Sequence, residues 1–534
     1  MRIAKKIICV LLTVVLSLSC LITAAAQENN NLDVIIISDT HYEAAALLNA
    51  STDDDSEKGE VYRNVNAQGK LSYESEAILR SMLQTFVESD TDIILIPGDI
   101  CDTDRQDYRL AIANIFKQVE ATGKKIYVIN GNHDISKFDS TIKFKEAFAD
   151  FGYNEALCVD SNSCSYTVEL DDNYRLIAVD SCVYGEDGGK INSNVMQWVE
   201  QQAIQAKHDG KKLIGIMHHA IIPHFFGESL LEGSLLIDNY SKVSEKFTNW
   251  GIKFVFTGHF HGNDISQSIS NNGNKIYDIM TGSLITYPNP YRKITFSDEK
   301  VTVNTMYVNQ IDTAYLPVGF TDTQLNAINQ DFVAYSKGFF EAGMARWINS
   351  YLGTPRKLAD ILNLSREDPT YKLLERLMPY IGNALSMPIY DDPDNPNAGS
   401  LEKVANYAGV EFPDSEYTTV SMLISKILGS QFAGDENIKA DSVEVTLLLD
   451  CMRSCIASAF SGILCDILYK NGLVSIFDFF GLNIRQIFEA SIAEKIFKSS
   501  ALEIEINRLI APIINGFTSD YYEPSDLNVE LESY

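Results

Sequence analysis

Six short apolar runs, rich in β-branched residues, precede residue 315, and several of the segments between them have apolar side chains at helical spacing. The runs are residues 34–37, 93–96, 126–129, 176–179, 213–217 and 254–256. The clearest helical segments are residues 75–88 and 108–122. Continuous apolar runs are typical of strands buried on both faces, and their alternation with helices is typical of an α/β domain. This pattern restricts the first part of the chain to an α/β fold whose loops gather at the strand ends.

Five of these runs end directly in side chains that bind metals. The motifs are IIISDTHY with Asp39 and His41, ILIPGDICD with Asp99, VINGNHD with Asn132 and His133, IGIMHHA with His218 and His219, and FVFTGHFHG with His259 and His261. A single Asp-x-His after a strand is more often a turn than a metal site. Buried imidazoles and carboxylates are costly unless they are paired, so cations would explain why five strands end in this way.

This set of motifs resembles the calcineurin-like metallophosphoesterase superfamily, whose signature is Asp-x-His, Gly-Asp, Gly-Asn-His-Asp/Glu, His and Gly-His-x-His. All five blocks are intact, and the resemblance covers residues 32–307. It implies an α/β fold, a four-layer αββα sandwich of two mixed sheets, and a hydrolytic site with two metal ions. Within the superfamily the chain looks most similar to exported bacterial phosphodiesterases that carry an added C-terminal helical domain.

The resemblance also assigns the metal ligands. The residues it places on the first metal ion are Asp39, His41, Asp99 and His261. It makes Asp99 a bridge to a second ion, which Asn132, His218 and His259 also bind. Mixed imidazole and carboxylate donors suit transition metals, so the expected cofactors are two divalent or trivalent ions, with Fe, Mn or Zn favoured. Two such ions, about 3.5 to 4 Å apart, can activate a water and neutralise a phosphoryl oxygen.

The catalytic roles that follow fall on the GNHD motif. His133 is expected to face the substrate and to protonate or stabilise the leaving alkoxide, and Asp134 to orient and charge that imidazole. Two positions depart from the superfamily pattern. Ala220 stands where a Pro usually ends His-x-Pro, so we expect His219 to lie outside the ligand set. Asp102 stands where the purple acid phosphatase branch has a Tyr ligand, which argues against an Fe(III)-tyrosinate site.

The chain of 534 residues is long enough for two domains. Residues 1–26 have the basic start, apolar run and small residues of a cleavable secretory leader, which predicts secretion or display on the outer face of a bacterial cell. An uncleaved anchor is the alternative, because the apolar run is just long enough to span a bilayer. We expect the catalytic domain at residues 32–310 and an all-α domain at residues 315–534, since aromatic residues at helical spacing follow residue 331.

Several further residues allow two interpretations. The polar insertion at residues 43–76 is a candidate lid or a plain loop. We expect His208 to be solvated, and His224 either to line the cleft or to pack at the surface. Cys158 and Cys164 are the one pair that could close a local disulfide loop. The helical region has no identified chemistry, because every histidine precedes residue 262.

The net charge of −29 becomes more negative once the leader is removed. Such a surface repels extended nucleic acids and anionic bilayers, so the expected partner is a small phosphate ester. A contact between the helical region and the cell surface is a rival role for that region, and the oligomeric state is left open. The leading hypothesis is an exported dinuclear phosphodiesterase, with cyclic nucleotides among its substrates. The alternatives are a phosphomonoesterase or 5'-nucleotidase, and an inactive surface-binding protein on the same fold.

Overall fold

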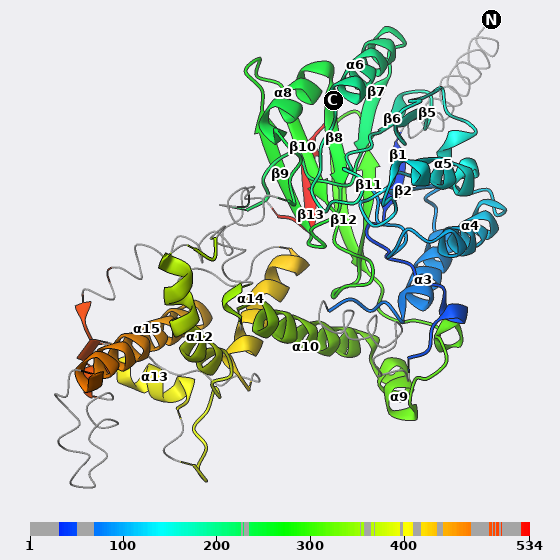
Figure 1. The fold of residues 1–534 in the computed structure, drawn as a ribbon. Helices are drawn as coiled ribbons and strands as arrows, with labels where there is room; N and C mark the ends of the chain where they lie inside the picture. Colours follow the sequence, from blue (N-terminus) through cyan, green and yellow to red (C-terminus); the bar gives the residue numbers. More distant parts are fainter. Residues whose placement is uncertain are drawn as a thin grey trace, which may run out of the picture.

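The computed structural model describes residues 31–50, 69–225, 228, 234–352, 354–356, 365–367, 369–395, 399–408, 418–434, 442–470, 491–493, 495–496, 498–500, 504 and 525–534. The expected leader, the middle of the insertion and parts of the expected all-α domain lie outside this set. The described part contains an α/β region, a helical region and a final strand that returns to the α/β region (Figure 1).

The first sheet has six strands in the order β13-β12-β11-β1-β2-β3. Their bounds are β1 Leu32–Ile36, β2 Ile93–Ile96, β3 Lys125–Val128, β11 Pro290–Phe296, β12 Lys300–Tyr307 and β13 Asn528–Glu532. Strands β1, β2 and β3 are parallel, with Val34 opposite Ile93 and Ile94 opposite Ile126, whereas β11, β12 and β13 pair antiparallel. The carboxyl ends of β1, β2 and β3 therefore share one edge of the sheet.

The second sheet has seven strands in the order β4-β5-β6-β7-β8-β10-β9. Their bounds are β4 Cys158–Val159, β5 Tyr166–Glu169, β6 Tyr174–Ala178, β7 Lys212–Ile216, β8 Ile252–Thr257, β9 Asp264–Ile269 and β10 Lys275–Met280. Strands β6, β7, β8 and β10 are parallel, and the rest are antiparallel. The predicted run at 93–96 agrees with β2 at both ends, and the other five runs match their strands within two residues.

Helices cover the outer faces of both sheets, which gives the predicted four-layer sandwich (Figure 1). The bounds are α3 Ser75–Glu88, α4 Gln106–Glu120, α5 Phe138–Ala147, α6 Ser193–His208 and α8 Tyr240–Trp250, with short turns η1 Ala45–Leu47 and η2 Ala149–Tyr153. In α3, Ile78, Met82 and Phe86 lie four residues apart and are buried. This spacing places them on one helical face, which packs into the main core of the first sheet.

The helical region begins after η3 Thr313–Tyr315. Its described helices are α9 Asp322–Gln330, α10 Phe332–Leu352, α12 Pro369–Leu385, α13 Leu401–Ala408, α14 Val420–Ala433 and α15 Val443–Lys470. Leu401, Val420 and Leu447 form a separate small core. In α10, Phe332 belongs to the main core of the α/β region, and Phe339 packs against it. Helix α10 thus joins the two regions.

The last described residues form a strand that we did not predict. β13 pairs with β12 in a register that places Val529 opposite Val303. The hydroxyl group of Tyr534 donates to the carbonyl of Leu213 at 2.5 Å, and its ring lies 5.3 Å from the ring of Phe254. Polar and apolar residues alternate in NVELE, and in the structure the apolar ones are buried. This alternation is the sequence signal that would have identified the strand. The expected all-α region therefore ends in a β-strand of the first sheet.

Helix α15 contains a stretch, Glu444–Gly462, that is long and apolar enough to cross a membrane by length and composition alone. In the structure, Leu447 and Cys451 on this helix pack into the small helical core. An apolar core helix passes the same test of length and composition, so we assign α15 to that core.

The disulfide considered for Cys158 and Cys164 is absent, and the cysteines at both positions are free. Cys158 packs on the outer face of the second sheet, where the indole N–H of Trp198 lies 3.4 Å from its sulfur. Cys164 is buried in the main core on the other side. The two sulfur atoms therefore belong to different layers, which sequence spacing alone does not reveal.

Glu74 links the start of α3 to the helical region and predicts a pH effect on stability. Its buried carboxyl group accepts a hydrogen bond from the hydroxyl of Tyr335 in α10 at 2.5 Å. Burial raises the pKa of Glu74 from 4.5 to about 7. The native state therefore retains a proton that the unfolded state releases, so the free energy of unfolding should fall as pH rises through this interval.

One pKa unit corresponds to about 1.4 kcal/mol, so the effect of Glu74 between pH 4.5 and 7 should be about 3 kcal/mol. Glu74→Gln should remove it, and the variant should gain stability relative to the wild type between pH 5 and pH 8. Denaturant titrations at the two pH values measure this, with Glu88→Gln on the exposed face of α3 as the matched control. An unchanged pH dependence in Glu74→Gln would show that this carboxyl group is not responsible.

Candidate metal centre

The loops that follow β1, β2, β3, β7 and β8 bring the seven candidate ligands into two adjoining groups. Asp39, His41 and His261 form one group, and their ligand atoms lie within 4.8 Å of one another. Asp99, His218 and His259 form a second group of the same compactness. The sequence placed these residues only at strand ends, and the parallel pairing of those strands is what brings them together.

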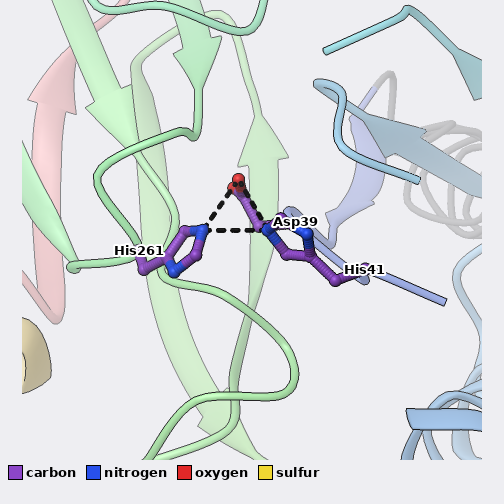
Figure 2. Close-up of side chains that lie close together, drawn as sticks. All are labelled: Asp39, His41 and His261. Atoms are coloured by element: carbon purple, nitrogen blue, oxygen red, sulfur yellow. Dashed lines mark hydrogen bonds and ion pairs between the residues drawn. The ribbon is translucent and has the colours of Figure 1, made fainter. Parts of the chain in front are cut away.

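In the first group, three ligand atoms surround one position (Figure 2). His41 Nε2 lies 3.0 Å from His261 Nε2, and His261 Nε2 lies 3.4 Å from Asp39 Oδ1. The third side, from His41 Nε2 to Asp39 Oδ1, is 3.9 Å. Neighbouring ligands on a six-coordinate ion with bonds of about 2.1 Å lie about 3.0 Å apart. The spacing and the N/O donor set therefore fit a transition-metal ion.

In the second group, His218 Nε2 is the common neighbour. It lies 3.3 Å from Asp99 Oδ2, 2.9 Å from Asn132 Oδ1 and 3.2 Å from His259 Nδ1. The same Asp99 Oδ2 atom lies 3.6 Å from His41 Nε2 in the first group. One carboxylate oxygen thus borders both groups, which is the position that a bridging ligand requires.

Hydrogen bonds fix the orientation of these side chains. His218 Nδ1 lies 3.1 Å from the carbonyl oxygen of Pro97, so Nδ1 donates and Nε2 is left to face the second group. The backbone N–H of His133 donates to Asp99 Oδ1 at 2.9 Å, which leaves Oδ2 facing the two groups. The backbone N–H of His259 donates to the Asp39 carboxylate at 3.1 Å. These hydrogen bonds therefore hold the candidate ligand atoms toward the two groups.

The electrostatics favour ligand forms at most positions. Burial, together with the nearby Lys70 ammonium, lowers the pKa of His41 to about 3. Burial also lowers the pKa of His259 and of His261, so these rings are neutral at pH 7. Burial disfavours the charged form of His218. The neighbouring carboxylates of Asp99 and Asp39 outweigh this effect and raise the pKa of His218 to about 9. A metal ion at this position would therefore displace a proton from His218.

Backbone strain is concentrated at the candidate ligands. Among the described residues, seven other than glycine have a positive φ angle, and five of them are Asp39, His41, Asp99, His259 and His261. Such conformations are uncommon for residues with a side chain, and they persist where the surrounding structure holds them for function. The positive φ angles are a property of the backbone, independent of the side-chain distances, and they identify the same loops as those distances do.

Two glycines permit the close approach of the loops. A Cβ atom added to Gly98 would lie 2.6 Å from His218 Nδ1 and 2.9 Å from the backbone nitrogen of Gly131. A Cβ atom added to Gly131 would collide with the backbone nitrogen and carboxylate of Asp99. The glycines of the Gly-Asp and Gly-Asn-His motifs are thus required because the two loops touch at the Asp99 carboxylate.

The role expected for Asp134 is wrong. Its carboxylate accepts from the backbone N–H groups of Ile100, Cys101 and Gly131 at 2.9 to 3.1 Å, and so ties two metal loops together. His133 Nδ1 instead lies 2.7 Å from the carbonyl oxygen of Asp102. The imidazole is therefore oriented by a backbone carbonyl, while Asp134 positions the loops that carry Asp99 and Asn132.

The remaining histidines are placed as follows. His219 has both ring nitrogens occupied by protein, at 2.9 Å from Ser181 Oγ and 2.9 Å from the carbonyl of Asp187, so it has no free ligand atom. His208 ends α6 and is exposed. His224 neither lines the metal groups nor packs at the surface: it is buried, with Nδ1 2.8 Å from Asp264 Oδ1. Sequence gave no sign of this internal ion pair.

Two residues near the first group were missed. Asp102 Oδ1 lies 3.1 Å from His41 Nδ1, where it can orient that ring, and Asp102 forms a third compact group with His41 and His133. Lys70, from the end of the insertion, places Nζ 3.4 Å from His41 Nε2. The position of Asp102 three residues after Asp99 was a signal for the first. No sequence signal marks Lys70, because its approach depends on long-range pairing.

Parts of this chain are similar to known proteins. Residues 32–263 match the family model described as calcineurin-like phosphoesterase. A probable cyclic nucleotide phosphodiesterase of Xenorhabdus bovienii is 27% identical over 203 residues, which cover 37% of this chain and 70% of that protein. Another, of Ruthia magnifica, is 22% identical over 199 residues, covering 37% and 73%. The solved structure of a dimetal phosphatase from Danio rerio is similar at a TM-score of 0.38 and 13% identity, covering 52% of this chain and 96% of that one. The family-model match spans all seven candidate ligands.

Proposed function

We propose that this chain, a metal-dependent phosphoester hydrolase with a calcineurin-like phosphoesterase domain, cleaves small phosphodiesters at a two-metal site, with cyclic nucleotides among its substrates. The observation that carries the two-metal proposal is the position of Asp99 Oδ2, 3.3 Å from His218 Nε2 and 3.6 Å from His41 Nε2. The preference for diesters is supported by relatives that are named as probable cyclic nucleotide phosphodiesterases.

The first ion would be held by Asp39, His41, Asp99 and His261, and the second by Asp99, Asn132, His218 and His259. Two bound transition-metal ions, with Fe, Mn or Zn proposed, supply an activated water and neutralise phosphoryl charge. His133 is only partly buried and lies beside the first group, 4.8 Å from the ring of His41. Because its Nδ1–H donates to the backbone carbonyl of Asp102, the proton for the leaving oxygen comes from Nε2, which carries one in the imidazolium form.

Export belongs to the proposal, because the expected leader at residues 1–26 lies outside the described residues. A phosphomonoesterase or 5'-nucleotidase on the same site is the nearest alternative, and a surface-binding protein without activity is the most distant one. A contact with the cell surface through the helical region remains a separate hypothesis.

The proposed function is tested with the purified chain after chelation, with Mn, Fe and Zn added separately. We expect hydrolysis of bis(p-nitrophenyl) phosphate to exceed that of p-nitrophenyl phosphate in kcat/KM with at least one metal. A large excess for the monoester would favour the phosphomonoesterase alternative. No hydrolysis of either ester with any of the three metals would contradict the proposed function.

His133→Ala should keep the metals but lose activity, most strongly for esters whose leaving group is a poor one. The variant retains the backbone N–H that holds Asp99, so the ligand geometry should survive. General acid assistance contributes about 100- to 10,000-fold, and an alkoxide leaving group needs it more than p-nitrophenolate does. Rates for the two kinds of diester measure the effect, with His208→Ala as the exposed control. An equal loss for both leaving groups would argue against this role.

A further inference from the structure

Lys70 places a buried positive charge beside the first metal group. Its side chain is almost fully buried, at 7% exposed for the residue. Its Nζ atom lies 3.4 Å from His41 Nε2, and its distance to Asp102 Oδ1 is 3.9 Å, too long for a hydrogen bond. Among the described residues, the ring nitrogen of His41 is therefore the one hydrogen-bond acceptor of this ammonium group, and Asp102 is its ion-pair partner.

The backbone holds Lys70 in this position. The N–H of Leu71 donates to the carbonyl of Ile285 at 2.8 Å, and Lys70 pairs with Thr286 in an isolated antiparallel bridge. On the other side, Gly69 has a φ of 69° and lies against Phe340 of α10, where an added Cβ would be 3.2 Å from the ring. The end of the insertion is thus fixed between the loop after β10 and the helical region.

His41 Nε2 cannot serve both the ammonium group of Lys70 and a metal ion. His41 Nε2 points at the first metal position, so its lone pair would bind the ion instead of the ammonium group. A buried ammonium group is costly without a partner. Asp102 Oδ1, at 3.9 Å, would keep its ion pair with the ammonium group but is too far to accept a hydrogen bond from it, so an acceptor is still needed. The substrate's phosphoryl group is anionic and would lie beside the ions, where it can supply that acceptor.

We propose that Lys70 binds a non-bridging oxygen of the phosphoryl group, as a third positive charge beside the two metal ions. This inference rests on the proposed function and adds a residue that sets specificity. A phosphate monoester dianion carries one more negative charge than a diester, so Lys70 should strengthen the binding of monoesters and of inorganic phosphate more than that of diesters. Lys70 therefore reduces the preference of the site for diesters over monoesters.

The test compares Lys70→Gln with the wild type and with Lys143→Gln, which removes a charge from the exposed surface of α5. Isothermal titration calorimetry measures the affinity of inorganic phosphate for the metal-loaded chain, and elemental analysis measures bound metal. Loss of a charge-assisted hydrogen bond should weaken phosphate binding about 10- to 100-fold in Lys70→Gln, with metal content unchanged. The ratio of kcat/KM for diester over monoester should rise, and Lys143→Gln should match the wild type in all three measurements.

Unchanged phosphate affinity at full metal content would overturn the proposal, and so would loss of metal, which would make Lys70 part of the metal scaffold. If Lys70→Gln does not fold, as judged by circular dichroism, Lys70→Met replaces it because it keeps the apolar stem without the charge. If the wild type hydrolyses the esters and Lys70→Gln matches it in phosphate affinity and in kcat/KM, only the role of Lys70 is refuted. A wild type without hydrolysis under any metal contradicts the proposed function itself.

Discussion

Asp99→Asn should abolish metal-dependent hydrolysis while the fold survives. The Asn side chain can still accept the His133 N–H through Oδ1, but it replaces the shared Oδ2 by an amide NH₂ group that cannot bridge two cations. The loss of hydrolytic activity should exceed the roughly 100-fold effect of mutating a residue that only hydrogen-bonds to a metal ligand. Hydrolysis of bis(p-nitrophenyl) phosphate and bound metal measure the two parts of this prediction.

Asp172→Asn is the matched control, because Asp172 is exposed on the turn before β6 and far in sequence from every metal loop. Its activity and metal content should equal those of the wild type. Near wild-type hydrolysis by Asp99→Asn would refute the bridging role of this carboxylate.

A chain that ends at residue 315 should aggregate or unfold. It loses two separate contacts: α10, whose Phe332 lies in the main core, and β13, which covers the edge of β12. Removal of one large buried aromatic side chain costs about 3 to 5 kcal/mol, and this truncation removes several. It also leaves β12 as an unpaired edge strand, which favours association between chains.

A second chain that ends at residue 524 separates the two contributions, because it keeps α10 and α14 but loses β13 and Tyr534. We expect a lower midpoint in thermal unfolding for this chain and a still lower one for the chain that ends at 315. A soluble, cooperatively melting and fully active chain ending at 315 would refute the packing of the two regions. Independent folding of residues 321–534 would then favour a separate binding module.

The helical region also contacts the metal loops directly, which gives the truncation a functional consequence. The N–H of Asn263 donates to the carbonyl of Phe432 at the end of α14 at 3.0 Å. The ring of Phe432 lies 5.1 Å from that of Phe260, which stands between His259 and His261. Helix α14 therefore supports the loop that carries one candidate ligand of each group, and its loss should weaken metal binding even in a chain that stays folded.

Local patterns were enough to predict the six strands β1, β2, β3, β6, β7 and β8 and the types of the candidate ligands, because both depend on short segments. The runs before Asp39, Asp99 and Asn132 are apolar on both faces, and the strand must end where the polar motif begins. The pairing of β1, β2 and β3 then follows from the parallel α/β arrangement. The shared edge at which the candidate ligands lie could therefore be anticipated from the sequence, whereas the four-layer sandwich and the two-metal assignment came only from the resemblance to the superfamily.

Features that depend on distant backbone groups could not be anticipated. Asp134 follows His133 in sequence, which suggested a side-chain pair, but the backbone N–H groups of Ile100 and Cys101 bind its carboxylate instead. Lys70 reaches His41 only because the insertion pairs with the loop after β10. In each case the contact depends on a backbone hydrogen bond or pairing with another loop, which the residue types do not reveal.

The most direct measurement of the central claim is a metal titration of the chelator-treated chain. Hydrolysis of bis(p-nitrophenyl) phosphate and bound metal are followed together as Mn, Fe or Zn is added. Two ions that share Asp99 predict that activity reaches its plateau at two ions per chain, and that chelation returns it to zero. Full activity at one ion per chain, or activity that persists under chelation, would contradict the two-metal site.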